Sequence, residues 1–166
     1  MNPAKKNEEL IKELRVSKIR EGTVIDHIDA GRALHVLRML GLTGGEGHVI
    51  AVVMNVESRK LGRKDIVKVE GLELEEEQVS KIALIAPSAT INIIRDYRVV
   101  EKIRVKTPGR VVGLLRCINP NCVSRLEREP IISVFHVESV RPLRLRCEYC
   151  GAMLGQEDVI VQLTGA

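Results

Sequence analysis

Hydrophobic residues along the first two thirds of the chain follow two different periods, one typical of strands and one typical of helices. Runs rich in Val and Ile predict extended strands over residues 16–27, 48–57, 65–74, 89–97 and 98–105. From Ala30 to Leu40 apolar residues recur at helical spacing, with Asp29 as a candidate N-cap and Gly41 as a C-terminal stop. A second helix is predicted over residues 75–86, because its apolar residues share one face and acidic residues fill its first turn.

The predicted order is strand, helix, strand, strand, helix and strand, followed by one further strand. That order is the ferredoxin-like βαββαβ pattern, an antiparallel sheet with both helices on one face. We expect this N-terminal domain to occupy residues 15–106, after a polar extension over residues 1–14. The predicted fold class is therefore α+β.

A turn-rich segment at residues 106–110 separates this region from the last third of the chain. Beyond it lie four short β-like runs: VVGLLRC, PIISVFHVE, LRLRC and DVIVQL. These runs predict a small all-β domain over residues 111–166. A domain of this size with few large apolar side chains usually needs a staple such as a metal ion.

The cysteines supply that staple. All four lie in the last third as C-x4-C and C-x2-C pairs, at Cys117, Cys122, Cys147 and Cys150. Two short pairs brought together by strands form the tetrahedral four-thiolate site that zinc favours. We expect one structural Zn²⁺ here, and not a catalytic one, because four protein ligands leave no open position for water.

Three other interpretations of the cysteines stay open at this point. Ordinary buried thiols are disfavoured because all four fall into two tight pairs. A redox dithiol would use one exposed C-x2-C and leave the other pair unexplained. Iron in an all-sulfur site is chemically possible, since spacing alone does not choose between the two metals.

The net charge of +4 comes from residues 1–110, which hold 20 Lys/Arg against 16 Asp/Glu, whereas residues 111–166 hold six of each. A sequence pI of about 9.0 suggests a nucleic-acid-binding zinc ribbon as the main rival function. The neutral cysteine segment argues against that rival, as does an aromatic content of one Phe, two Tyr and no Trp. We therefore expect no nucleic-acid partner.

No run of the sequence approaches the ~20 apolar residues that a membrane span requires. The first 15 residues are charged throughout and lack the hydrophobic stretch of a signal peptide. We therefore expect a cytoplasmic protein with no membrane partner. In a reducing cytosol, paired cysteines more often indicate a metal than a disulfide.

The N-terminal region contains no Walker loop, no G-x-G-x-x-G and no Ser/His/Asp array, so we expect no catalytic residues. A free-standing enzyme with a metal-stapled appendix remains the second rival. Polar residues embedded in extended runs are most simply solvated strand faces, but lysines that converge across a sheet can hold a triphosphate. The residues in question are Asp26, His27, Lys64, Lys68, Asn92, Tyr97 and Lys102.

Four segments together carry a family resemblance: GTVIDHI (22–28), GRKDIVKVE (62–70), LIAPSATIN (84–92) and DYRVV (96–100). Followed by C-x4-C and C-x2-C, they resemble the regulatory chains of aspartate carbamoyltransferase from about Val16 to near the C-terminus. The resemblance implies a non-catalytic subunit that dimerises through its N-terminal domain and binds CTP and ATP there. It also implies a zinc domain that docks on the catalytic chain, in an assembly of two catalytic trimers with three regulatory dimers.

Residue by residue, the resemblance implies three groups of contacts. The nucleoside would lie against Val16, Ser17, Lys18, Ile19, Asp26, Lys68, Asn92, Ile94, Tyr97 and Val99. His27, Lys64 and Lys102 would face the phosphates. Asn119, Asn121 and Tyr149 would contact the catalytic chain, whereas Gly151 stands where the family has an acidic contact residue.

Overall fold

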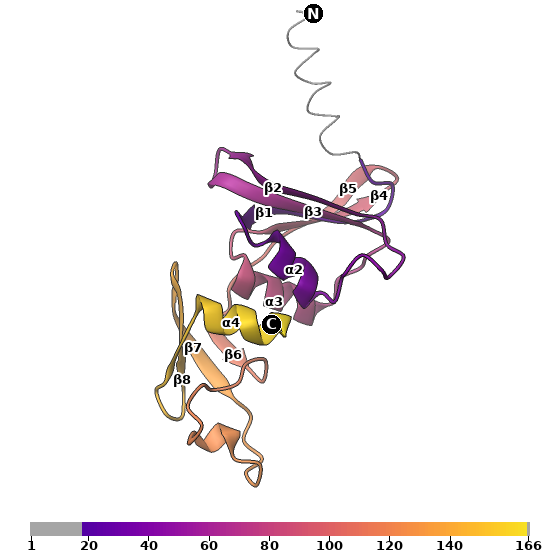
Figure 1. Cartoon of the computed structure of the whole chain (residues 1–166). Helices are drawn as coiled ribbons and strands as arrows, with labels where there is room; N and C mark the ends of the chain where they lie inside the picture. The colour runs from indigo at the N-terminus through magenta and orange to yellow at the C-terminus, as the bar shows by residue number, and fades with distance from the viewer. Residues whose placement is uncertain (1–17, 166) are drawn as a thin grey trace, which may run out of the picture.

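The computed structural model describes residues 18–165, which fold around two antiparallel sheets (Figure 1). The first sheet has five strands in the order β2-β3-β1-β4-β5. Its elements are β1 (Gly22–Asp29), α2 (Ala33–Met39), β2 (Ile50–Ser58), β3 (Gly62–Glu70), α3 (Glu76–Ile85), β4 (Thr90–Arg95) and β5 (Arg98–Arg104). This is the predicted ferredoxin-like arrangement, with α2 and α3 on the same face of the sheet.

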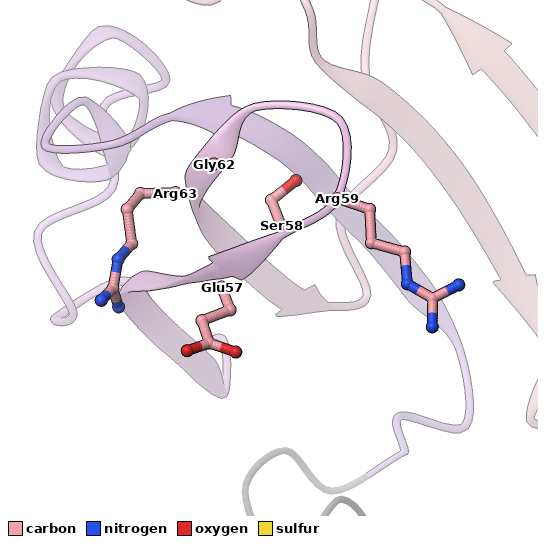
Figure 2. A pocket seen from close by; sticks show the side chains of 5 residues that line it. All are labelled: Glu57, Ser58, Arg59, Gly62 and Arg63. Atoms are coloured by element: carbon pink, nitrogen blue, oxygen red, sulfur yellow. The ribbon is translucent and has the colours of Figure 1, made fainter.

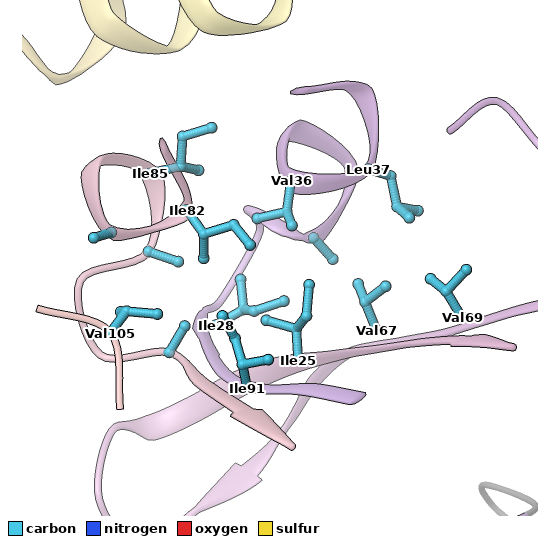
Figure 3. Packing of buried hydrophobic residues seen from close by; sticks show 14 of the residues in the cluster. Ile25, Ile28, Val36, Leu37, Val67, Val69, Ile82, Ile85, Ile91 and Val105 are labelled. Carbon is cyan, nitrogen blue, oxygen red and sulfur yellow. The ribbon is translucent and has the colours of Figure 1, made fainter. Parts of the chain in front are cut away.

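The main core fills the space between this sheet and its two helices (Figure 3). Ile25 of β1 lies opposite Val67 of β3 and Ile91 of β4, and all three are fully buried. Val36 of α2 and Ile82 of α3 close the core from the helix side. Because side chains alternate along a strand, the other residues of β1, β3 and β4 point to the face that carries no helix.

The second sheet has four strands in the order β6-β7-β8-β9. Its elements are β6 (Arg110–Val112), β7 (Val134–Val140), β8 (Leu143–Cys147) and β9 (Met153–Gly155), with a short 3-10 turn, η1, at Val123–Arg125 and a final helix, α4, at Gln156–Thr164. Phe135 is fully buried at the centre of this smaller core. The antiparallel sheet confirms the β character predicted for this region.

One predicted strand of this region is wrong, because the run DVIVQL lies within helix α4. The Asp158 carboxylate accepts a hydrogen bond from the backbone amide of Gly155 (2.8 Å), which stabilises the start of the helix. Val159 and Ile160 are buried, and Leu163, one turn further on, packs against both hydrophobic cores. A helix rather than a strand lets these residues cover one side of the junction between the two sheets.

Helix α4 packs against α2 and α3, and the last turn of α3 is the centre of this junction (Figure 1). Carbonyls at a helix C-terminus have no partner within the helix. Here three side chains satisfy them: Thr107 donates to Ala83 O (3.2 Å), Gln156 to Leu84 O (3.2 Å) and Arg32 to Ile85 O (2.7 Å). The two sheets are therefore connected by hydrogen bonds as well as by apolar contact.

Asp65 on β3 is a buried carboxylate that organises the neighbouring backbone. It accepts hydrogen bonds from the amides of Gly31 (2.8 Å), Ala33 (3.0 Å) and Asn55 (2.8 Å). The registers of β1 and β2 against β3 both shift beside it, and Asp65 holds the β2 bulge at Asn55 and the segment from Gly31 to the first residue of α2. Asp29, predicted as the N-cap, instead ends β1, and the helix begins later, at Ala33, without a side-chain cap from its own N-cap residue.

We expect Asp65→Ala to lower the free energy of unfolding by about 2–4 kcal/mol, because three backbone amides lose their acceptor next to the core. Urea unfolding of the metal-loaded chain, followed by far-UV circular dichroism, measures the change. Glu46→Ala is the matched control, since Glu46 also accepts three hydrogen bonds from Thr43 and Gly44 but is exposed. A control that destabilises as much as Asp65→Ala would contradict the role assigned to burial.

Candidate functional site

The helix-free face of the first sheet carries a row of predicted nucleotide residues. Lys68 of β3 lies opposite Val24 of β1, Val24 lies opposite Asn92 of β4, and Asn92 lies opposite Lys102 of β5. Residues opposite each other in antiparallel strands share a face, and their neighbours Ile25, Val67 and Ile91 point into the core. Facing residues that are 10 to 68 positions apart in the sequence thus lie side by side on one surface.

Asp26, His27 and Lys64 meet at one end of this face. Lys64 Nζ lies 2.9 Å from Asp26 Oδ1, and the same carboxylate oxygen accepts a hydrogen bond from the backbone amide of His27 (2.6 Å). His27 sits within the β1 bulge and has a φ of 54°. This left-handed backbone conformation is uncommon for residues other than glycine and often marks a functional site. The bulge thus brings the imidazole and the Lys64 ammonium together beside Asp26.

The imidazole of His27 lies in a positive environment. Burial lowers the pKa of His27; Asp26 raises it, and the positive charges of Lys64, Lys60 and Lys102 lower it. Within the described residues, its Nδ1 is shielded from solvent and has no hydrogen-bond partner. Nδ1 lies 3.7 Å from Asp26 Oδ2, and the surrounding excess of positive charge is suited to an anionic ligand such as phosphate.

Lys60 is a residue that the sequence-based site did not contain. It lies in the turn between β2 and β3, in the basic stretch SRKLGRK, and its charge acts on His27. The basic composition of that turn was the available signal. The sequence alone does not show that this turn lies near the β1 bulge. Its position follows from the pairing of β1 with β3.

The hairpin between β4 and β5 meets the first described residues of the chain. Tyr97, at the turn, donates its backbone amide to Arg20 O (3.1 Å), and Arg20 lies 3.8 Å from Asp96. In these two segments the side chains of Ile19 and Ile94 are buried. Those of Lys18, Tyr97 and Val99 are exposed. The predicted nucleoside contacts at Lys18 and Ile19 thus lie next to this hairpin, whereas Val16 and Ser17 lie outside the described residues.

A cavity of about 660 Å³ at the tip of the β2–β3 hairpin lies apart from these residues (Figure 2). Glu57 and Arg63, which are cross-strand partners, line it together with Arg59. Lys64 follows Arg63 directly, so the two side chains point to opposite faces of the strand. None of the predicted nucleotide residues lines the cavity.

The four cysteines converge in the second domain, with all four Sγ atoms within 4.8 Å of one another. Cys117 Sγ lies 3.5 Å from Cys150 Sγ, and Cys122 Sγ lies 3.7 Å from Cys147 Sγ. A zinc–sulfur bond of about 2.3 Å in a tetrahedron places sulfurs about 3.8 Å apart, whereas a disulfide needs about 2.05 Å. The cluster therefore has the dimensions of a tetrahedral metal site and not of two disulfides.

Backbone amides from both cysteine loops point at the sulfurs. Burial raises the pKa of Cys117 to about 12, although the amide of Asn119 acts against it, whereas the amide of Ala152 lowers the pKa of Cys150 to about 6. Burial likewise raises the pKa of Cys147. Thiols buried in this way ionise together only when a cation neutralises them, so the site is suited to a metal ion.

The residues predicted to contact a partner surround this cluster. Asn119 precedes Cys122 in the first loop, and its side-chain oxygen Oδ1 accepts a hydrogen bond from the backbone amide of Asn121 (3.0 Å). Tyr149 lies in the second loop, is 42% exposed, and donates its hydroxyl to Ile132 O (3.0 Å). Exposed Ile118 and Ile132 add apolar surface to the same part of the domain.

The fold and the cysteine cluster define a two-domain protein that joins a ferredoxin-like sheet to a four-cysteine metal-binding domain. Residues 14–106 match the family model of the allosteric domain of the aspartate carbamoyltransferase regulatory chain, and residues 109–160 match the model of its metal binding domain. The chain therefore belongs to the family of aspartate carbamoyltransferase regulatory chains. No helix among residues 18–165 is long and apolar enough to cross a membrane.

Individual relatives agree with this assignment. The aspartate carbamoyltransferase regulatory chain of Korarchaeum cryptofilum is 61% identical over 153 residues, which cover 92% of this chain and 98% of the relative. That of Hyperthermus butylicus is 64% identical over 150 residues, covering 90% and 94%. That of Thermofilum pendens is 63% identical over 150 residues with the same coverage.

Titration of the metal-free chain with Co²⁺ should give the intense visible bands of a tetrahedral thiolate site, saturating at one equivalent per chain. Cys122→Ser should weaken metal binding by at least tenfold, because Cys122 is buried and a hydroxyl is a poor ligand for the ion. Ser124→Ala is the control, since it changes the hydroxyl 3.2 Å from Cys122 Sγ and keeps all four ligands. Equal metal affinity in wild type and Cys122→Ser would exclude this ligand set.

Proposed function

We propose that the chain is a non-catalytic allosteric subunit of aspartate carbamoyltransferase that binds CTP- or ATP-type nucleotides on its first sheet. The observation that carries this proposal is the meeting of His27 and Lys64 at Asp26, with the positive charges of Lys60 and Lys102 close enough to lower the pKa of His27. Membership of the regulatory-chain family supports it.

The phosphates of the nucleotide contact His27, Lys64 and Lys102, and Lys60 adds a fourth positive charge. Charge-assisted hydrogen bonds to phosphate are shorter and stronger than neutral ones, so a triphosphate gains most from this end of the sheet. Lys64 is paired with Asp26 at 2.9 Å. A bound phosphate competes for Lys64, which leaves Asp26 available to accept a hydrogen bond from the nucleoside.

The nucleoside lies along the row that leads away from this cluster. Lys68, Asn92, Ile94, Tyr97 and Val99 supply polar and apolar contacts, together with the segment Val16 to Ile19. Burial lowers the pKa of Lys68 while Asp26 raises it, so the ammonium is partly desolvated on the sheet. A nucleoside site requires apolar surface against which the base packs and a few directional hydrogen bonds that fix its orientation.

The metal is one structural Zn²⁺ bound by Cys117, Cys122, Cys147 and Cys150. It holds the two cysteine loops in place and thereby supports the surface formed by Asn119, Asn121 and Tyr149, which docks on the catalytic chain. The exposed side chains of Ile118 and Ile132 fit a protein partner, because apolar surface of this kind marks interaction sites.

In this assignment residues 1–14 are an extension, residues 15–106 the nucleotide domain and residues 111–166 the docking domain. The nucleotide domain forms a dimer, and three such dimers join two catalytic trimers in the cytoplasm. Effector control then requires only that the nucleotide bind two states of the assembly unequally, typically by about 1–3 kcal/mol.

Co-expression with the catalytic chain, size-exclusion chromatography and aspartate saturation curves with and without CTP and ATP test the whole proposal. A stable complex whose half-saturating aspartate concentration moves with nucleotide is the expected result. A complex that fails to form, or a curve that nucleotides leave unmoved, would refute the function proposed here. Turnover by the isolated chain would refute the non-catalytic assignment.

Lys102→Ala should weaken nucleotide binding to the holoenzyme roughly tenfold and leave assembly intact, because one charge-assisted contact to phosphate is lost. Calorimetric titration with CTP measures the change. Lys81→Ala removes the same charge from α3, on the helix side of the sheet, where Lys81 pairs with Glu77, and should leave the affinity within twofold. If both variants bind alike, Lys102 acts only through net charge.

Cys122→Ser, or removal of the metal with a chelator, should release the catalytic chain while the full-length chain still binds CTP. The reason is that the metal supports the docking surface, whereas the nucleotide residues belong to a sheet with its own core. Gel filtration reports release and calorimetry reports nucleotide binding on the same sample. Simultaneous loss of both activities would mean that the two domains are not separable.

A further inference from the structure

Arg141 connects the metal domain to the strand that carries the nucleotide residues. It lies between β7 and β8, and its guanidinium reaches across the junction to Asp29, the last residue of β1 (Nη1 to Oδ1, 2.5 Å). The second nitrogen, Nη2, donates to the Ser88 hydroxyl in the segment between α3 and β4. One side chain of the metal domain therefore holds two separate segments of the first domain.

Asp29 depends on this contact. Its side chain is only 14% exposed, and among the described residues its Oδ2 has no hydrogen-bond partner. The other nearby cation, Arg32, lies 4.0 Å away and donates to Ile85 O instead. A carboxylate in this position is costly to leave without a donor, so Asp29 and Arg141 are expected to move together.

Asp29 is also adjacent to the proposed phosphate site in two directions. Along β1 it is two residues from His27, and across the ladder its partner is Lys64. The Asp65 carboxylate fixes the next amides of the chain, at Gly31 and Ala33. A displacement of His27 or Lys64 by a bound phosphate would therefore act directly on Asp29, which is two residues from the first and the cross-strand partner of the second.

We propose that Arg141 is the positioning residue through which the nucleotide site sets the orientation of the metal domain, acting by its contacts with Asp29 and Ser88. This inference rests on the function proposed above. A ligand shifts an equilibrium only as far as it interacts unequally with the two states. Asp29 supplies that difference, because its position depends on Lys64 and the orientation of the metal domain depends on Arg141.

The test uses the holoenzyme assembled with Arg141→Gln, and the readout is the shift in half-saturating aspartate caused by saturating CTP or ATP. We expect that shift to fall to less than half of the wild-type value, while nucleotide still binds by calorimetry and the metal content is unchanged. Arg146→Gln is the matched control. Arg146 is about as exposed as Arg141 and forms an ion pair of similar length, but with Glu138 of its own domain, a carboxylate that is more exposed than Asp29.

The double variant Asp29→Asn/Arg141→Gln should lose no more of the shift than either single variant, because the two residues act as one unit. If Arg141→Gln keeps the full shift, or if the losses of the single variants add, the inference is overturned. If Arg141→Gln does not assemble, Arg141→Lys, which keeps the charge but has one nitrogen in place of the two that contact Asp29 and Ser88, is held to the same criterion. A wild-type holoenzyme that neither binds nor responds to nucleotide would instead refute the proposed function.

Discussion

The carboxylate of Asp65 is the interaction on which the geometry of the first domain depends. It is fully buried, and it binds three amides from two segments of backbone, the one that leads into α2 and the one that contains Asn55 of β2. Without it, the bulge of β2 at Asn55 and the start of α2 would each need another acceptor. A buried charge is tolerated when hydrogen bonds satisfy it, and in return it fixes the local register of β1 and β2 against β3.

The cysteine cluster plays the corresponding role in the second domain, by a different physical means. The core around Phe135 contains few large side chains, and three of the four cysteines belong to it. A metal ion that joins Cys117 and Cys122 to Cys147 and Cys150 cross-links loops from opposite ends of the domain. Metal binding and folding are then coupled, so the shape of the surface at Asn119 and Tyr149 follows the occupancy of the site.

The sequence was sufficient wherever local pattern and topology agree. The βαββαβ order, the antiparallel sheet and the convergence of the four cysteines follow from periodicity and spacing, and all three are confirmed. The helix of DVIVQL was missed, because a short run of Val, Ile and Leu has no distinct period and burial against α2 and α3 decides its conformation. Lys60 and the start of α2 were missed since both depend on cross-strand neighbours, namely the β1 bulge and Asp65.

The junction between the domains explains how two separately stabilised cores can influence each other. Carbonyls of the last turn of α3 accept hydrogen bonds from Arg32 of the first domain and from Gln156 of the second, while Leu84 packs into the second core. Arg141 then ties the β7–β8 hairpin to the end of β1. Each of these contacts is small by itself, and an exposed ion pair contributes about 0–1 kcal/mol. A coupling free energy of about 1–3 kcal/mol is of the same size, so a few contacts of this kind are enough to relate one site to another.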